Sequence, residues 1–142
     1  MVHWVGHEKD HIISIWSSLK KDVIGPKVLE RMFVVYPWTQ KYFPFDGKFK
    51  AEDHPVKVHA DKVVSALDIA VAHLDSVKDN FTELSKKHAD IFHVDVENFK
   101  LLADCFIIEL AHCLQAKFTP EVQVAWEKFF KVVVDALSKE YH

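Results

Sequence analysis

Apolar residues recur three and four positions apart along most of this 142-residue chain, and few helix-breaking residues interrupt them. The chain holds only three glycines and five prolines, the residue types that most often mark turns. The last segment shows the period clearly at Val122, Trp126, Phe129 and Val133, so we expect a helix there and not a strand. The pattern predicts an all-α fold, and the length fits a single domain over residues 1–142.

Prolines, glycines and capping residues divide this pattern into segments. We expect helices over 7–19, from 25–26 to 35, and over 37–42, 55–75, 81–92, 96–117 and from 120 onward. Asp95 and Thr119 stand where a side-chain oxygen can cap a following helix. The stretch from Phe43 to Pro55 is irregular and holds three phenylalanines, which either pack beneath a loop or form the wall of a ligand site.

Composition and charge exclude several classes of function. Hydrophobic residues make up 49% of the chain and charged residues 27%, as in a globular protein. The formal net charge of -3 gives no reason to expect nucleic acid or an acidic membrane as a partner, and no apolar run is long enough to span a bilayer. Cys105 and Cys113 lie eight residues apart in one apolar stretch, too far along a helix for a disulfide. Reduced thiols suit the cytosol.

Two histidines interrupt apolar helix faces. Phe81, Leu84, His88 and Phe92 follow one another at spacings of 3, 4 and 4 residues, which places them on one side of a helix. His59 begins a similar stripe on the preceding helix. A buried imidazole needs a hydrogen-bond partner or a metal, so each is either a core histidine bonded to a carbonyl or a ligand. The apolar residues around both histidines are Phe43, Val63, Leu67, Leu84, Phe92, Val94, Phe99 and Leu102.

The chemistry of this pair narrows the alternatives. No cysteine or carboxylate pair accompanies the two histidines, so a four-ligand zinc site is poorly supported. The Glu-x-x-His pairs that hold two metal ions in helix bundles do not occur in the right arrangement. No recognisable motif supplies the nucleophile, base and acid of a catalytic triad. A flat apolar cofactor that carries its own metal does fit, with one histidine as axial ligand and one on the open side. Haem is such a cofactor.

Several longer motifs carry a resemblance to a known family. They are YPWTQ at 36–40, VKVHADKV at 56–63, LSKKH at 84–88, HVDVENF at 93–99 and YH at 141–142. With these motifs the chain resembles the globins, and among them the fish-like beta-type chains of vertebrate haemoglobin. The resemblance implies about seven to eight helices around a haem pocket. The stretch 43–55 is shorter than is usual for beta-type chains, which predicts that the short fourth helix of the family is missing.

The resemblance implies a reversible oxygen carrier, not an enzyme, that holds haem b in the cytoplasm of red blood cells. His88 would be the proximal ligand of the iron, and His59 would donate a hydrogen bond to O2 on the distal side. The other residues that the resemblance places around haem are Phe43, Lys62, Val63, Leu67, Leu84, Phe92, Val94, Asn98, Phe99, Leu102 and Leu137. Lys62 would lie near a haem propionate.

The resemblance also implies partners and regulation. In an alpha2-beta2 tetramer with haemoglobin alpha-type chains, Trp38, His93 and Asp95 would lie at the contact between alpha-beta dimers, although Trp38 alone could equally be a core residue. His142 would pair with Asp90 in the deoxygenated state and bind protons there. The residues that resemble an organic-phosphate site are Val2, His3, Lys78 and Lys139.

The chain also departs from the family pattern. Val96 replaces a proline, which predicts a less rigid start for the next helix, and Ala60 replaces a glycine, which predicts a slight separation of two helices at Gly25. Two other functions compete with oxygen transport. One is a haem enzyme or sensor for nitric oxide dioxygenation or nitrite reduction, and the other is a helical interaction domain without haem. The subunit-contact residues favour the carrier over the enzyme.

Overall fold

The computed structural model describes residues 2–141, which fold entirely into helices and connecting segments without a strand. The elements, in chain order, are α1 (Glu8–Ser18), α2 (Lys21–Val35), η1 (Pro37–Tyr42), α3 (His54–Ala72), α4 (Val77–Asn80), α5 (Thr82–Lys87), η2 (His88–Phe92), α6 (Glu97–Leu114), η3 (Gln115–Lys117) and α7 (Pro120–Ser138). The predicted all-α class is confirmed. No helix falls between 43 and 53, as the short length of that stretch predicted.

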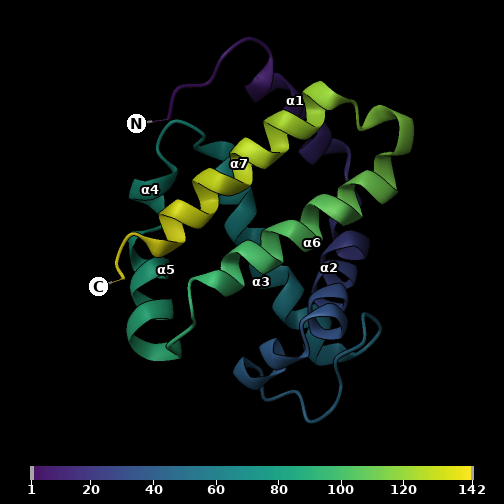
Figure 1. The fold of residues 1–142 in the computed structure, drawn as a ribbon, viewed down its shortest axis with the longest axis vertical. Coiled ribbons are helices and arrows are strands. Elements are labelled where there is room, and N and C mark those ends of the chain that lie inside the picture. The colour runs from purple at the N-terminus through teal and green to yellow at the C-terminus, as the bar shows by residue number, and fades with distance from the viewer. Residues whose placement is uncertain (1, 142) are drawn as a thin grey trace.

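The helices cross one another in layers. Helix α2 packs against both α3 and α6, and α7 packs against α1, α4 and α6. Figure 1 shows α6 and α7 on the near side of the molecule with α3 passing behind them. Trp16 of α1 and Trp126 of α7 meet in the core, with ring centroids 6.2 Å apart. The aromatic rings of Phe106, Phe129 and Phe130 extend this cluster, so the core between α1, α6 and α7 is built largely from aromatic side chains.

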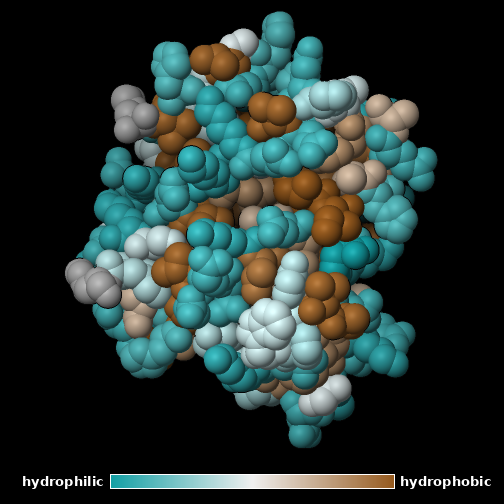
Figure 2. Space-filling model, viewed as in Figure 1, coloured by the Kyte–Doolittle hydropathy of each residue, from teal (hydrophilic) through white to brown (hydrophobic). Residues whose placement is uncertain are grey.

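The surface mixes polar and apolar side chains. Figure 2 shows hydrophobic patches between hydrophilic ones on the face that α6 and α7 cross. None of the helices that the structure describes combines the length and the apolar composition of a membrane span.

Two expected helix boundaries were wrong. Helix α2 begins at Lys21, so Gly25 and Pro26 lie inside it and do not open it. The amide N–H groups of Val23 and Ile24 donate to the carbonyl of Lys20, which closes the first turn ahead of the proline. Pro26 has no N–H to donate to the Asp22 carbonyl, so α2 lacks this one bond of the ladder and continues through the proline.

The helix expected over 81–92 is divided. Helix α4 ends at Asn80, α5 covers Thr82–Lys87, and the turn His88–Phe92 is π-helical. His93 then adopts a left-handed conformation with φ of 52°, which ends the turn. Such π-turns occur frequently at functional sites. The wider turn also changes one prediction, because Phe92 is 54% exposed and does not lie in the core of this chain.

Both residues that were expected to cap a helix accept a backbone hydrogen bond, although the residue directly before α6 is Val96 and not Asp95. The Thr119 side chain accepts a hydrogen bond from the Val122 amide at 3.3 Å, and Pro120 takes the first helical position of α7. The Asp95 carboxylate accepts a hydrogen bond from the Glu97 amide at 3.0 Å. This cap holds the start of α6 at the point where Val96 stands in place of a proline.

The irregular stretch after η1 forms an aromatic cluster. The rings of Phe43, Phe45 and Phe49 pack edge-on against Phe33 of α2, with centroid distances of 5.1, 6.1 and 4.9 Å. Packing beneath the loop is therefore confirmed. Phe43 also lies edge-on to His59, with centroids 4.8 Å apart, so the same cluster reaches the histidine of α3, and its role as the wall of a ligand site stays a prediction.

Gly25 sets the close approach of α2 to α3. A Cβ atom at Gly25 would lie 3.3 Å from the Ala60 Cβ and 3.3 Å from the Val64 Cγ2. The methyl group of Ala60 therefore occupies the space that Gly25 leaves. This contact holds α3, and with it His59, against α2.

A larger side chain at this crossing should destabilise the fold. We expect Gly25→Val to lower the free energy of unfolding by about 1–3 kcal/mol, the usual cost of overpacking, as measured by urea denaturation. Val23→Leu, on an exposed side of the same helix, should change it by less than about 0.5 kcal/mol. Equal stabilities of the two variants would show that α2 and α3 can separate freely.

Candidate functional site

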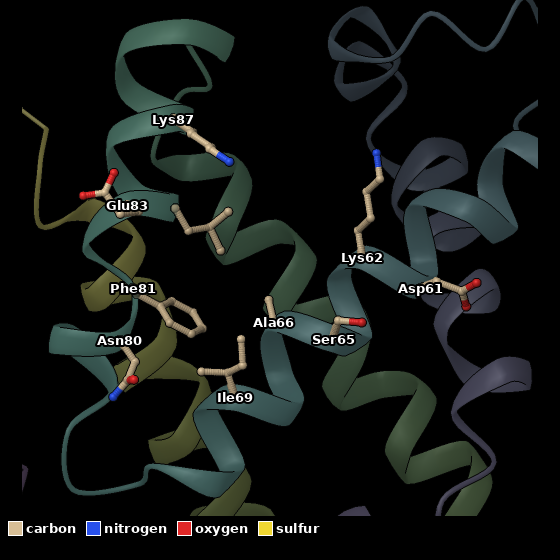
Figure 3. A pocket seen from close by; sticks show the side chains of 10 residues that line it. Asp61, Lys62, Ser65, Ala66, Ile69, Asn80, Phe81, Glu83 and Lys87 are labelled. Carbon is tan, nitrogen blue, oxygen red and sulfur yellow. The ribbon is translucent and has the colours of Figure 1, made fainter.

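A cleft separates α3 from the α4–α5 segment, and Figure 3 shows it from close by. Its volume is about 510 Å³, within the usual range for a small-molecule site. The residues that line it are Asp61, Lys62, Ser65, Ala66, Ile69, Asn80, Phe81, Glu83, Leu84 and Lys87. The apolar members come from both walls. Neither histidine is among the lining residues, but His59 lies one turn before Lys62 on α3 and His88 directly follows Lys87, so each is close in sequence to a residue of the cleft.

His88 is held in one orientation by its own helix. Its Nδ1 lies 2.8 Å from the carbonyl oxygen of Leu84, and the nitrogen that faces a carbonyl must carry the proton. The opposite nitrogen, Nε2, is then left with a free lone pair, which is the arrangement found in metal-binding histidines. The rings of Phe92 and Phe99 lie edge-on to the imidazole, each with a centroid distance of 5.3 Å.

Burial keeps both imidazoles neutral. It lowers the pKa of His88, and the hydrogen bond to the Leu84 carbonyl only partly offsets this. Burial also lowers the pKa of His59 from 6.5 to about 4, with smaller contributions from the charges of Lys62 and His88. A neutral imidazole can bind a metal through one nitrogen and donate a hydrogen bond through the other.

The ligand set suits a cofactor that brings its own metal. Within residues 2–141, no three His, Cys, Asp or Glu side chains converge to hold a metal ion. Two histidines on separate helices, one with its Nε2 free, could each offer a ring nitrogen to a metal that the cofactor itself carries. The structure therefore fits a planar metal-containing group such as haem between α3 and the His88 turn.

Of the other predicted haem residues, Lys62 and Leu84 line the cleft. Leu67 and Phe99 are buried, and Val63, Leu84, Leu102 and Leu137 are partly buried against the core. Two of the predicted residues are engaged elsewhere. The Val94 carbonyl accepts a hydrogen bond from the Tyr141 hydroxyl at 2.6 Å, and the Asn98 side-chain amide donates to the Tyr42 hydroxyl at 3.1 Å.

Sequence reasoning missed several residues of the site. Lys87 lines the cleft, whereas its neighbour Lys86, which carries the same charge, does not line it. Phe45 approaches His59 with a ring centroid distance of 6.3 Å. Ser85 is fully buried, and its hydroxyl donates to the Leu137 carbonyl at 2.6 Å and accepts from the Glu140 amide at 3.1 Å. Ser85 is a polar residue on the inward helix face, one turn before His88, and this position is the sequence signal that could have identified it.

The predicted subunit-contact residues lie on the surface. Trp38 is 55% exposed and packs edge-on against Tyr36, which overturns the alternative that it is a core residue of this chain. His93 and Asp95 are also exposed. The Tyr42 hydroxyl lies 3.4 Å from the Asp95 amide, so η1 and the segment before α6 form one continuous surface.

The residues predicted to bind protons and organic phosphate lie on another side. Figure 1 places the N-terminal segment, α4 and the end of α7 along the same edge of the molecule. Lys128 donates to the His3 carbonyl at 2.6 Å and so holds this segment to α7. Val2, Lys78 and Lys139 belong to these three elements. Asp90 is exposed in the π-helical turn, whereas its predicted partner His142 lies outside the described residues.

Comparisons with known proteins agree with this geometry. The globin family model matches residues 26–137, and the chain belongs to the globin family. It is similar to haemoglobin subunit beta of Heterodontus portusjacksoni, at 55% identity over 99% of this chain and 100% of the relative. It is also similar to haemoglobin subunit beta of Mustelus griseus, at 48% identity over the full length of both chains. These relatives are haemoglobin subunits and not enzymes.

Solved structures show the same similarity. The deoxy haemoglobin of Dasyatis akajei matches with a TM-score of 0.95 and 42% identity, covering 99% of this chain and 100% of the other. The haemoglobin of the shortfin mako, Isurus oxyrinchus, matches with a TM-score of 0.88 and 49% identity at the same coverage. The predicted globin fold and the resemblance to beta-type chains are confirmed.

The lowered pKa of His59 predicts acid sensitivity of the cofactor-free chain. Between pH 6.5 and about 4, unfolded His59 binds a proton that folded His59 does not. The free energy of unfolding should therefore fall as the pH falls through this window, by up to about 1.4 kcal/mol per pH unit for this group. His88 shifts in the same direction. Urea unfolding followed by circular dichroism between pH 7.5 and 4.5 measures this slope.

A matched pair of variants isolates the contribution of His59. His59→Leu should flatten the pH dependence, because the group that binds the extra proton on unfolding is gone. The same change at the exposed His73 should leave the slope as it is in the wild type. If His59→Leu keeps the full slope, the acid sensitivity comes from other groups.

Proposed function

We propose that this chain is an oxygen-binding, beta-type haemoglobin subunit that holds haem b between α3 and the turn after α5. The observation that carries the proposal is the orientation of His88, whose Nδ1 is engaged by the Leu84 carbonyl while Nε2 remains available. His59 on the facing helix and the apolar cleft support it. Haem supplies an iron that binds O2 reversibly.

His88 acts as the proximal ligand in this proposal. The hydrogen bond at Nδ1 selects the tautomer and fixes the ring plane, as carbonyl partners do for metal-binding histidines. Phe92 and Phe99 flank the ring and limit its rotation. The depressed pKa of His88 keeps its Nε2 unprotonated in the neutral pH range.

His59 acts on the opposite side as a hydrogen-bond donor. Its depressed pKa keeps the imidazole neutral, with one N–H to donate and no positive charge to attract anions. The edge-on rings of Phe43 and Phe45 restrict where this N–H can point. Apolar walls also exclude water, and charge separation is costly in such surroundings, so the site favours reversible binding of O2 over loss of superoxide.

The visible absorption spectrum tests this assignment. The ferrous wild-type protein should show a five-coordinate spectrum without oxygen and convert reversibly to an oxygenated one in air. His88→Gly should lose the five-coordinate spectrum, and added imidazole should restore it, because the free base can occupy the vacated position. His93→Gly should leave the spectrum unchanged.

Other outcomes separate the competing functions. A six-coordinate deoxygenated spectrum, or rapid oxidation to the ferric state, would favour a haem sensor or enzyme over a carrier. A folded chain that takes up no haem would overturn the proposal. An unaltered spectrum in His88→Gly would assign the proximal position to another residue.

We further propose that the chain assembles with haemoglobin alpha-type chains into an alpha2-beta2 tetramer in the cytoplasm of red blood cells. The exposed Trp38, with His93 and Asp95 on the adjoining surface, supports a contact between alpha-beta dimers. A large exposed aromatic side chain is the type of residue that dominates protein interfaces.

Removal of the Trp38 ring should weaken the tetramer. With an alpha-type partner and without oxygen, Trp38→Ala should raise the dimer–tetramer dissociation constant by about 30-fold or more, as expected for an interface hot spot. Sedimentation velocity over a range of concentrations measures this constant. Val5→Ala removes another half-exposed apolar side chain and should leave it unchanged, and equal constants for both variants would remove Trp38 from the interface.

Two regulatory sites complete the proposal. Asp90 is exposed beside His88, where it can receive the imidazole of His142 and raise its pKa, so that protons and oxygen oppose each other. The amine of Val2 after removal of Met1, with His3, Lys78 and Lys139, offers positive charge to an organic phosphate. Cooperativity would arise from the coupling of such sites between subunits.

A further inference from the structure

The start of α1 carries two histidines that lie one helical turn apart. His7 directly precedes the helix, and His11 follows four residues later in the sequence His-Glu-Lys-Asp-His. The His11 amide donates to the His7 carbonyl at 2.9 Å, so both residues lie on the same face of the turn. Their ring centroids are 6.4 Å apart. Two histidines at this spacing, with a glutamate after the first, are the ligand pair of many zinc-binding helices.

A carboxylate from the other end of the chain faces this pair. Helix α1 packs against α7 (Figure 1), and Glu121 belongs to the first turn of α7. The Glu121 Oε2 lies 3.7 Å from the His11 Nε2. Zinc bonds of about 2.0–2.2 Å hold two ligand atoms of one tetrahedral ion roughly 3.4 Å apart, so an ion between these two atoms needs little rearrangement. A cavity of about 470 Å³ at this place is lined by Gly6, His7, Glu8, His11, Pro120, Glu121 and Val124.

Two nearby lysines are engaged by other carboxylates. Lys9 donates to Asp75 at 2.6 Å, and Lys128 donates to Glu8 at 2.8 Å. Neither ammonium group lines the cavity. The Glu121 side chain is largely exposed, and within residues 2–141 its one ion-pair contact is the contact with a histidine ring. A cation that enters the cavity therefore meets two imidazoles and a carboxylate without competition from these lysines.

We propose that His7, His11 and Glu121 bind a divalent transition-metal ion, and that Zn²⁺ fits their chemistry best. Imidazole and carboxylate are ordinary zinc ligands, and water fills the fourth position. In residues 2–141, as the structure describes them, no three such side chains converge on one point. The ring of His7 is exposed and has one contact, 3.4 Å from its Nδ1 to Asp10, so it turns toward the other two ligands when the ion binds.

Glu8 is not a catalytic base at this site. In zinc hydrolases the glutamate after the first histidine takes a proton from a metal-bound water. Here the Glu8 carboxylate accepts hydrogen bonds from Lys128 at 2.8 Å and from the Val5 amide at 2.7 Å. These two bonds, with that of Lys128 the larger cause, lower the pKa of Glu8, which makes it a poorer proton acceptor. The bound ion therefore links α1 to α7 and performs no hydrolysis.

Zinc titration of the full-length, haem-loaded chain tests the site. In a Cys113→Ser background, which removes an exposed thiol that also binds zinc, calorimetry should show one Zn²⁺ bound per chain. His11→Gln should weaken the affinity by about tenfold or more, because it removes one bond to the metal. Glu121→Gln should weaken it by about threefold or more, since a neutral amide is a poorer zinc ligand. His73→Gln removes another exposed histidine and should change the affinity by less than about twofold.

The stability of the chain distinguishes an ion that links two helices from one that binds loosely. An ion that binds the folded chain stabilises it, so saturating Zn²⁺ should raise the midpoint of urea unfolding, and Glu121→Gln should lose most of this rise. The proposal is overturned if His11→Gln binds zinc as tightly as His73→Gln does. It is also overturned if Glu121→Gln keeps both the full affinity and the full rise, because α7 would then take no part in the site.

Discussion

The hydrogen bond between the Leu84 carbonyl and His88 Nδ1 is the contact on which the site depends. It selects the tautomer, leaves Nε2 without this partner and anchors the imidazole at the start of the π-helical turn. Without it the ring could rotate, and the facing histidine would have no fixed partner. The other features of the region serve this geometry. Ser85 fixes α5 against the core, and Phe99 closes one side of the ring.

Helical periodicity was a strong guide to the fold because apolar spacing reports directly on which face is buried. It identified the last helix correctly despite three consecutive valines at 132–134, and it placed His88 on an inward face. It failed where a boundary depends on backbone geometry. Pro26 was taken as a helix start, but a proline in the second turn costs only one hydrogen bond, and α2 continues through it.

The site was predictable to the extent that its residues are apolar or imidazole. His59 and His88 stand out because a polar ring on an apolar stripe needs a partner. Lys87 could not be found this way, since an exposed lysine beside another lysine resembles ordinary surface charge. Only the position of its ammonium group relative to the cleft distinguishes it from Lys86. The spacing of apolar residues also could not predict the π-helical turn, because a single wide turn shifts the period by only one residue.

The tether formed by Ser85 has a mechanical consequence. Its hydroxyl joins α5 to the Leu137 carbonyl and the Glu140 amide, and the next residue, Tyr141, holds the Val94 carbonyl on the other side of the π-helical turn. Hydrogen bonds to residues 137–141 therefore hold both sides of the segment that carries His88. A small movement of His88 along its helix axis would strain these three hydrogen bonds at once. The positions of the imidazole and of residues 137–141 are therefore coupled through these hydrogen bonds.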